Sequence, residues 1–175
     1  GNKSGKVLLT MFSQNTNLLL AFLRDHNTAR SVLDVFNDLY AMFGRETYCR
    51  LFPVILTDRG SEFSNPVPIE QDENDELRSL VFYCNPSAPY QKGGIEVAHE
   101  LVRRVLPKGK SFDDLQQEDI DLMLSHINSY KRGKLNSRSA YQLFNFIYGD
   151  DILPKLNIRE IEANDIVLSP KLLKK

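Results

Sequence analysis

The chain has 175 residues, 42% hydrophobic and 26% charged, and its mass of 20.1 kDa suits one globular domain with a substantial core. Its two cysteines and three scattered histidines exclude a disulfide framework and a four-ligand zinc site. A formal net charge of −1 excludes a uniformly basic DNA-coating protein, but the second half is the more basic one and leaves room for a local basic surface. No apolar run reaches the roughly 18–20 residues that span a bilayer, and the N-terminus does not resemble a signal peptide, so we expect a reducing cytoplasm.

The first half of the chain predicts a hairpin, a helix and a strand. Two apolar runs at 7–12 and 18–23, separated by polar residues, predict antiparallel strands. Asn27 or Thr28 can cap a helix whose apolar residues recur at helical spacing up to position 43, with Gly44 as its expected end. The compact apolar run at 52–57 predicts a strand buried on both faces.

The second half of the chain predicts a strand followed by helices. Residues 66–76 are polar and acidic and are expected to be mostly loop, and residues 80–84 are a further strand candidate. Helical spacing resumes at 95–106, around 120–127 and at 141–148, and a short strand is expected at 166–168 before a basic end. This order predicts an α/β or α+β domain with helices against a small mixed sheet.

Asp58 is the first candidate for chemistry. It follows an apolar strand directly, and open α/β sheets place their ligand sites at the carboxyl ends of strands. The alternative is a turn aspartate that bonds its own backbone before Gly60. Glu62, four residues further on, is another acid near this turn, and a local capping role is favoured for it over metal ligation.

Glu96 is the second candidate, in the first turn of the helix expected at 95–106. An acid in a first turn is also favoured by the helix dipole alone, by a few tenths of a kcal/mol. His99, Glu100 and Arg103 share its helix face, which is either solvated or lines a site. Two carboxylates on rigid elements suit Mg²⁺, but a two-metal site needs a further bridging carboxylate that is not obvious in this chain.

Several motifs occur together in one order. They are TDRGSEF at 57–63, YCNPSAPYQKGGIE at 83–96, LVRRVLPKG at 101–109, HINSY at 126–130 and PKLLKK at 170–175. Together they resemble the catalytic core of bacterial insertion-sequence transposases, with the insertion sequence thirty family as the nearest match. The core of that family resembles the core of retroviral integrases.

This resemblance implies a ribonuclease-H-like fold with an Asp-Asp-Glu metal triad that holds two Mg²⁺ or Mn²⁺ ions. Asp58 matches the second acid and Glu96 the third, 38 positions apart, with Glu100 as the alternative third acid. The chain departs from the family where His99 and Arg59 stand in place of asparagine, which puts the fine positioning of metal and DNA in question.

No residue of this chain matches the first acid of the triad. In the family it lies on a central strand just before the residues that match 1–6, and Asp25 and Asp34 come too late to replace it. We therefore expect that this chain alone does not cleave DNA. We also expect that a strand is missing or substituted beside residues 54–57.

The resemblance also implies function and partners. The intact protein would cut double-stranded DNA at transposon ends and join the 3′-hydroxyl to target DNA, as a homo-oligomer in a bacterial cytoplasm, associated with the nucleoid and not with a membrane. Residues 1–150 would form the catalytic core and 151–175 a C-terminal extension. The residues expected on the DNA are Lys92, His99, Arg103, Arg104, Lys108, Lys110, Lys131 and Arg132, with Lys134 and Arg138.

Two rival hypotheses remain open. The chain could be a non-catalytic DNA-binding or assembly remnant of a decayed transposase, which the missing first acid favours. It could also be a related ribonuclease-H-like nuclease or Holliday-junction resolvase, which the KGGIE and PKG motifs disfavour.

Overall fold

The computed structural model describes residues 5–88 and 93–174, which divide into two compact units. The discontinuous unit contains residues 5–23 and 94–174, and the continuous unit contains residues 24–88 and Gly93. Together they have the α/β composition expected from the sequence. Residues 151–174 lie in the same unit as 94–150, and the boundary expected at 150 stays a prediction.

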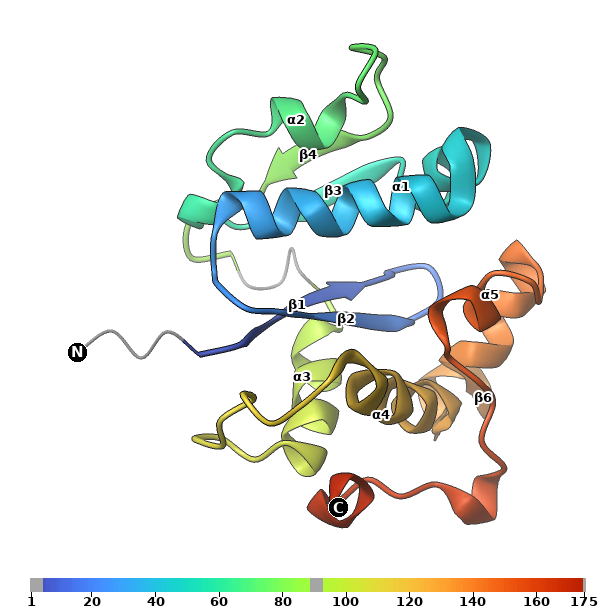
Figure 1. Cartoon of the computed structure of the whole chain (residues 1–175). Helices are drawn as coiled ribbons and strands as arrows, with labels where there is room; N and C mark the ends of the chain where they lie inside the picture. Colours follow the sequence, from blue (N-terminus) through green and yellow to red (C-terminus); the bar gives the residue numbers. More distant parts are fainter. Residues whose placement is uncertain (1–4, 89–92, 175) are drawn as a thin grey trace. The chain divides into compact units, whose positions relative to one another are not determined.

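The discontinuous unit begins with the predicted hairpin. Strand β1 (Val7–Phe12) pairs with β2 (Leu19–Arg24), and Figure 1 shows the two strands running in opposite directions. The turn is closed by the N–H of Ser13, which donates to the carbonyl of Leu18 at 2.9 Å. Asn17 adopts a positive φ of 58°, a conformation that asparagine tolerates better than most residues.

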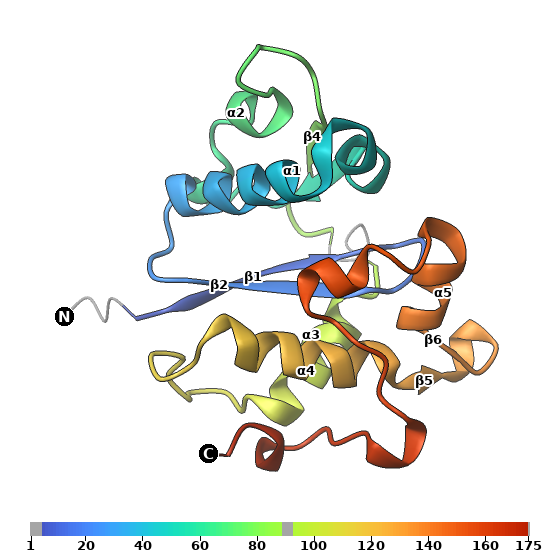
Figure 2. The ribbon, with the colours of Figure 1, turned by 45° about the vertical axis from the view of Figure 1, so that its right-hand side comes forward.

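Three helices complete this unit, as the hydrophobic spacing predicted: α3 (Ile95–Val105), α4 (Gln117–Ser129) and α5 (Ala140–Tyr148). Short 3₁₀ turns η3 (Gly133–Leu135), η4 (Leu153–Leu156), η5 (Ala163–Asp165) and η6 (Pro170–Leu173) connect or follow them. Figure 2 shows α4 between the hairpin and the C-terminal segment, and nine of its thirteen residues are buried. The strand expected at 166–168 is absent, because the N–H of Val167 donates to a side chain of α4 and not to another strand.

The continuous unit begins with helix α1 (Ala29–Leu51). Thr28 is its N-cap, as one of the two predicted candidates: Thr28 accepts from the N–H of Ser31, and the Ser31 hydroxyl faces back to the N–H of Thr28. The predicted end at Gly44 is only partly right. Gly44 leaves the helical conformation (φ 75°, ψ 165°), and the chain then resumes helical geometry up to Leu51.

Strands β3 (Val54–Thr57) and β4 (Leu80–Tyr83) form a two-stranded parallel pair with Val54 opposite Leu80 and Thr57 opposite Tyr83. The prediction that β3 is buried on both faces is wrong, since Val54 is 56% exposed and Leu56 41%. A short apolar run does not reveal whether one or both of its faces are covered. Here α1 lies along one side of the pair (Figure 1), while one face of β3 and β4 keeps its large apolar side chains exposed.

The edge of β3 opposite β4 carries no strand from residues 5–88 or 93–174. Leu80 N–H donates to the carbonyl of Pro53 and Cys84 N–H to that of Thr57. Alternate residues of a parallel strand point their peptide groups to opposite sides, so Val54 and Leu56 direct theirs to the open edge. This agrees with the expectation of a missing or substituted strand beside 54–57.

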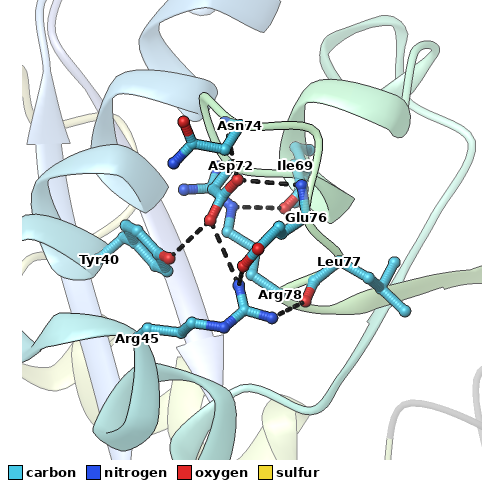
Figure 3. A network of polar contacts seen from close by, with 8 residues as sticks. All are labelled: Tyr40, Arg45, Ile69, Asp72, Asn74, Glu76, Leu77 and Arg78. Carbon is cyan, nitrogen blue, oxygen red and sulfur yellow. Dashed lines mark hydrogen bonds and ion pairs between the residues drawn. The ribbon is translucent and has the colours of Figure 1, made fainter.

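The segment at 66–79 is more ordered than the predicted loop. It contains the short helix α2 (Val67–Glu70) and a turn in which one oxygen of Asp72 accepts the N–H groups of Asn74 and Glu76. Figure 3 shows that the other oxygen of Asp72 accepts the Tyr40 hydroxyl (2.8 Å) and Arg45 (3.2 Å). The Tyr40 hydrogen bond is the leading cause that lowers the pKa of Asp72, and the backbone N–H groups and Arg45 act in the same direction.

Arg78 fastens the end of the same segment. Its guanidinium is buried and donates to the carbonyls of Ile69 and Pro68 and to the side chain of Asn37. It also lies over the ring of Tyr40, 5.1 Å from the centroid. An acidic sequence is therefore held by the buried Arg78 and by Tyr40 and Arg45 of α1, which its own composition does not reveal. None of the helices in the described part of the chain is long and apolar enough to cross a membrane.

Candidate functional site

Asp58 stands where the sequence placed it, directly after the carboxyl end of β3. The last rung of the parallel pair, Cys84 N–H to Thr57 C=O at 2.8 Å, fixes the backbone immediately before it. The side chain of Asp58 is exposed, and its Oδ1 accepts the N–H of Gly60 at 3.0 Å. The hydrogen bond expected of a turn aspartate therefore forms, and it also fixes the direction of an exposed carboxylate at a strand end.

Glu62 shares this turn. It lies in the 3₁₀ turn η1 (Ser61–Phe63), and a Cβ atom added at Gly60 would lie 2.7 Å from Glu62 Oε2 and 3.0 Å from Asp58 Oδ1. Glycine at position 60 thus lets two carboxylates approach the same stretch of backbone. Carboxylate oxygens are the ligands that hard divalent cations prefer, so the donor set of this turn fits Mg²⁺ or Mn²⁺.

Glu96 is exposed in the first turn of α3, as predicted. Gly94 is the N-cap of that helix, with a left-handed φ of 75°. A Cβ atom at Gly94 would lie 2.7 Å from Cε1 and Cζ of Phe12 on β1. The glycine therefore lets the start of α3 pack closely against the hairpin, and this packing sets the position of Glu96.

His99 lies one turn after Glu96 but is half-buried. Its Nε2 is 2.9 Å from the Thr10 hydroxyl of β1, so the ring joins α3 to the hairpin. The side chains of Glu100, Arg103 and Arg104 are exposed. Of the four ionisable residues predicted on one face of this helix, His99 is bonded to a strand and the other three are exposed. A DNA contact by His99 stays a prediction.

The two matched acids belong to different units, Asp58 to the continuous unit and Glu96 to the discontinuous one. The structure describes the surroundings of each acid within its own unit. That the two acids bind one metal site together stays a prediction. Among the residues at 5–88 and 93–174, no three histidine, cysteine, aspartate or glutamate side chains form a group of the kind that holds a metal ion.

The basic residues expected on DNA gather in two places of the discontinuous unit. Arg103 and Arg104 end α3, and Lys108 and Lys110 are exposed in the turn that follows it. Lys92 lies outside the described residues.

The second group is a small basic ribbon made of β5 (Lys131–Arg132), η3 and β6 (Arg138–Ser139). Lys131, Lys134 and Arg138 are exposed, and Arg132 pairs directly with Arg138 across the two strands. Nε and Nη2 of Arg132 are buried with no hydrogen-bond partner in the described part of the chain, and burial lowers the pKa of this guanidinium. Like charges opposite each other destabilise a ribbon, and a bound anion would relieve that repulsion.

Sequence reasoning missed the structural part of two motifs. Asn128 is fully buried, and its side chain accepts from the N–H of Leu19 (2.9 Å) and donates to the carbonyl of the same residue (2.8 Å). The polar residue within an apolar helix period was the available signal. For the contact of Gly94 with Phe12, the glycine itself was the one indication in the sequence.

Comparison with known proteins finds relatives of two kinds. The chain is 28% identical over 144 residues to ORF3 of Spiroplasma virus SpV1-R8A2 B, a predicted integrase. The matched segment covers 82% of this chain and 42% of the viral protein. It is 35% identical over 63 residues to the transposase of IS1086 from Cupriavidus metallidurans, covering 36% of this chain and 19% of that protein. It is 27% identical over 94 residues to the transposase of IS4351 from Bacteroides fragilis, covering 54% of this chain and 28% of that protein.

A transposase of IS30A from Escherichia coli is also similar, at 27% identity over 63 residues, which cover 36% of this chain and 16% of that protein. No protein-family model matches the chain. The chain spans less than half the length of the curated relatives it matches.

Proposed function

We propose that the chain is part of the catalytic core of a DNA transposase of the insertion sequence thirty type, with a ribonuclease-H-like fold. The observation that carries the proposal is the placement of two acids in a chain similar to transposases and an integrase. Asp58 follows the carboxyl end of a parallel strand, and Glu96 stands in the first turn of a helix capped by glycine. Both positions suit a carboxylate that must hold its direction while it remains accessible.

Asp58 and Glu96 would hold Mg²⁺ or Mn²⁺, with Glu62 beside Asp58. A bound pair of such ions activates the attacking oxygen and stabilises the leaving oxygen of an in-line displacement at phosphorus. The residues of the chain supply fixed carboxylates, a turn that orients one of them, and cationic side chains for the DNA backbone. Water would be the attacking group in strand cleavage and a DNA 3′-hydroxyl in strand transfer.

The first acid of the triad, which would join Asp58 and Glu96, would come from a strand outside residues 1–175 that pairs with the open edge of β3. Two features support this proposal: Val54 and Leu56 direct their peptide groups to that edge, and Asp58 follows at its end. A strand added there would leave no unpaired edge beside the acid. Efficient strand transfer by the present chain alone, with Mg²⁺ or Mn²⁺, would contradict this part of the proposal.

DNA would contact the basic end of α3 and the basic ribbon. In the ribbon, a phosphate would offset the repulsion between Arg132 and Arg138 and accept hydrogen bonds from their guanidinium groups. Binding of this kind is largely independent of DNA sequence and weakens with salt. As in the resembling family, we expect an oligomer to hold two DNA ends.

Metal binding is tested by titrating Mn²⁺ into ¹⁵N-labelled protein and following paramagnetic broadening of amide signals. We expect the signals of Asp58–Gly60 and of the first turn of α3 to broaden first. Asp58→Asn should abolish the broadening at 58–60. Gly60→Ala should weaken it, because the added Cβ would displace both carboxylates. The φ of −57° at Gly60 suits alanine, so this substitution adds no backbone strain. Glu73→Gln, at an exposed acid of the 66–79 segment, is the control.

DNA binding is tested separately on Arg138→Ala with Lys155→Ala as the exposed control. Loss of one phosphate contact should reduce the slope of log affinity against log salt by about 0.9, equally for unrelated DNA sequences. Salt-dependent DNA binding without Mn²⁺ binding at Asp58 would favour the non-catalytic DNA-binding remnant. If the chain binds neither DNA nor Mn²⁺, both proposed functions are refuted.

A further inference from the structure

The C-terminal part of the discontinuous unit is held by side chains of α4. We define the strap as residues 159–168. Three of its backbone N–H groups donate to α4: Arg159 to Ser125 Oγ at 3.1 Å, Ile161 to Ser129 Oγ at 2.9 Å, and Val167 to His126 Nδ1 at 3.0 Å. All three acceptor side chains are buried.

These bonds replace the sheet partner that the strap lacks. Ser125 and Ser129 are one helical turn apart and hold the first part of the strap, and His126 holds its last part. The chain then enters η6, which packs against α3 and α4. Figures 1 and 2 both show the C-terminal turn beside the end of α3 that is farther from the hairpin. The strap therefore connects α4 to η6, the turn that packs against α3.

We propose that His126 is a positioning residue that fastens the strap and releases its last part when the imidazole takes up a proton. The Val167 N–H needs an unprotonated Nδ1 as acceptor. A doubly protonated imidazolium carries an N–H on both nitrogens, so Nδ1 would face the Val167 N–H as a second donor. The two serine hydroxyls do not titrate, so residues 159–161 would stay bound while residues 163–168 detach. This inference does not depend on the proposed catalytic function.

The surroundings of His126 favour the neutral ring. Burial is the leading cause that lowers its pKa, the charge of Arg159 acts in the same direction, and Asp165 opposes both. Arg159 and Asp165 both belong to the strap. The charged side chains of α3 and Lys171 of η6 are exposed and are not among the groups that act on this ring, and α5 has no charged residue.

The sign of the effect follows from this lowered pKa. The folded, strapped state prefers neutral His126, so the attachment is complete above the pKa of a free histidine. It weakens as the pH falls through that value toward the lowered pKa of the attached ring. The maximal weakening is about tenfold in the opening equilibrium for each unit by which attachment lowers the pKa.

Amide hydrogen exchange in the unaltered chain tests the proposal, with protection expressed relative to the intrinsic exchange rate at each pH. Between pH 7.5 and pH 5, protection at Val167 should fall, by up to about tenfold for each such unit, whereas protection at Arg159 and Ile161 should change less than twofold. His126→Asn places a non-titrating oxygen near the position of Nδ1 and should make Val167 protection independent of pH. His26→Asn, at an exposed histidine, should behave like the unaltered chain.

A second measurement on the unaltered chain keeps the proposal testable if His126→Asn does not fold. The ring nitrogen shifts of His126 and the amide shift of Val167 should titrate with the same midpoint. Different midpoints, Val167 protection that does not depend on pH, or an equal loss at all three amides would each overturn the proposal.

Discussion

Gly94→Ala isolates the contact that sets the start of the helix carrying Glu96. The backbone of Gly94 has φ 75°, where an L side chain costs roughly 1–2 kcal/mol. The new methyl group would also lie 2.7 Å from two atoms of the Phe12 ring, and moving that ring out of its rotamer costs about 0.5–1.5 kcal/mol more. We therefore expect the free energy of unfolding to fall by about 1.5–3.5 kcal/mol.

Gly109→Ala is the matched control. Gly109 has a similar positive φ of 87° in the same unit, and no atom lies within 4 Å of the position of an added Cβ. It should show the backbone cost alone, about 1–2 kcal/mol. Urea unfolding followed by circular dichroism gives both values.

A double variant separates the two contributions further. Replacing Phe12 by alanine in the Gly94→Ala protein removes the ring, so the Gly94→Ala cost measured in that background should approach the Gly109→Ala cost. If Gly94→Ala and Gly109→Ala cost the same in the presence of Phe12, the ring contact contributes nothing and the reasoning is refuted.

Three further predictions concern buried polar groups. Asn128→Ala should lower the free energy of unfolding by about 2–4 kcal/mol, since it leaves both peptide groups of Leu19 without a partner, and urea titration measures the loss. Asp72→Asn should lower the melting temperature at pH 7, and this loss should shrink as the pH falls: the hydrogen bond from Tyr40 lowers the pKa of Asp72, so the stabilisation is present above the pKa of a free aspartate and is lost as the pH falls through the lowered value. Asp121→Asn should raise the melting temperature at pH 7, because burial raises the pKa of Asp121 and the charged carboxylate becomes costlier as the pH rises; an unchanged value at pH 7 would contradict this.

Local sequence signals predicted the elements whose determinants lie within a few residues. The hairpin, the cap at Thr28 and the helices that became α3, α4 and α5 depend on alternation, capping and helical spacing. Asp58 and Glu96 were placed correctly on a strand end and a helix start for the same reason.

The sequence did not predict features that depend on distant residues. The 66–79 segment is ordered by Tyr40 and Arg45 from α1, and its own composition resembles a loop. The strap is held by α4 side chains and is not a strand. Exposure of Val54 and Leu56 depends on which face of β3 is covered, and an apolar run contains no such information.

The division of the chain has a consequence for its synthesis on the ribosome. The continuous unit occupies one stretch of sequence, so its contacts are available as soon as that stretch has emerged. The hairpin emerges earlier, but its buried residues wait for partners such as Asn128, whose bond to Leu19 closes a loop of 109 residues. A nascent chain therefore exposes Leu18 and its neighbours until Asn128 has emerged, and this interval is when aggregation or chaperone binding would compete with folding.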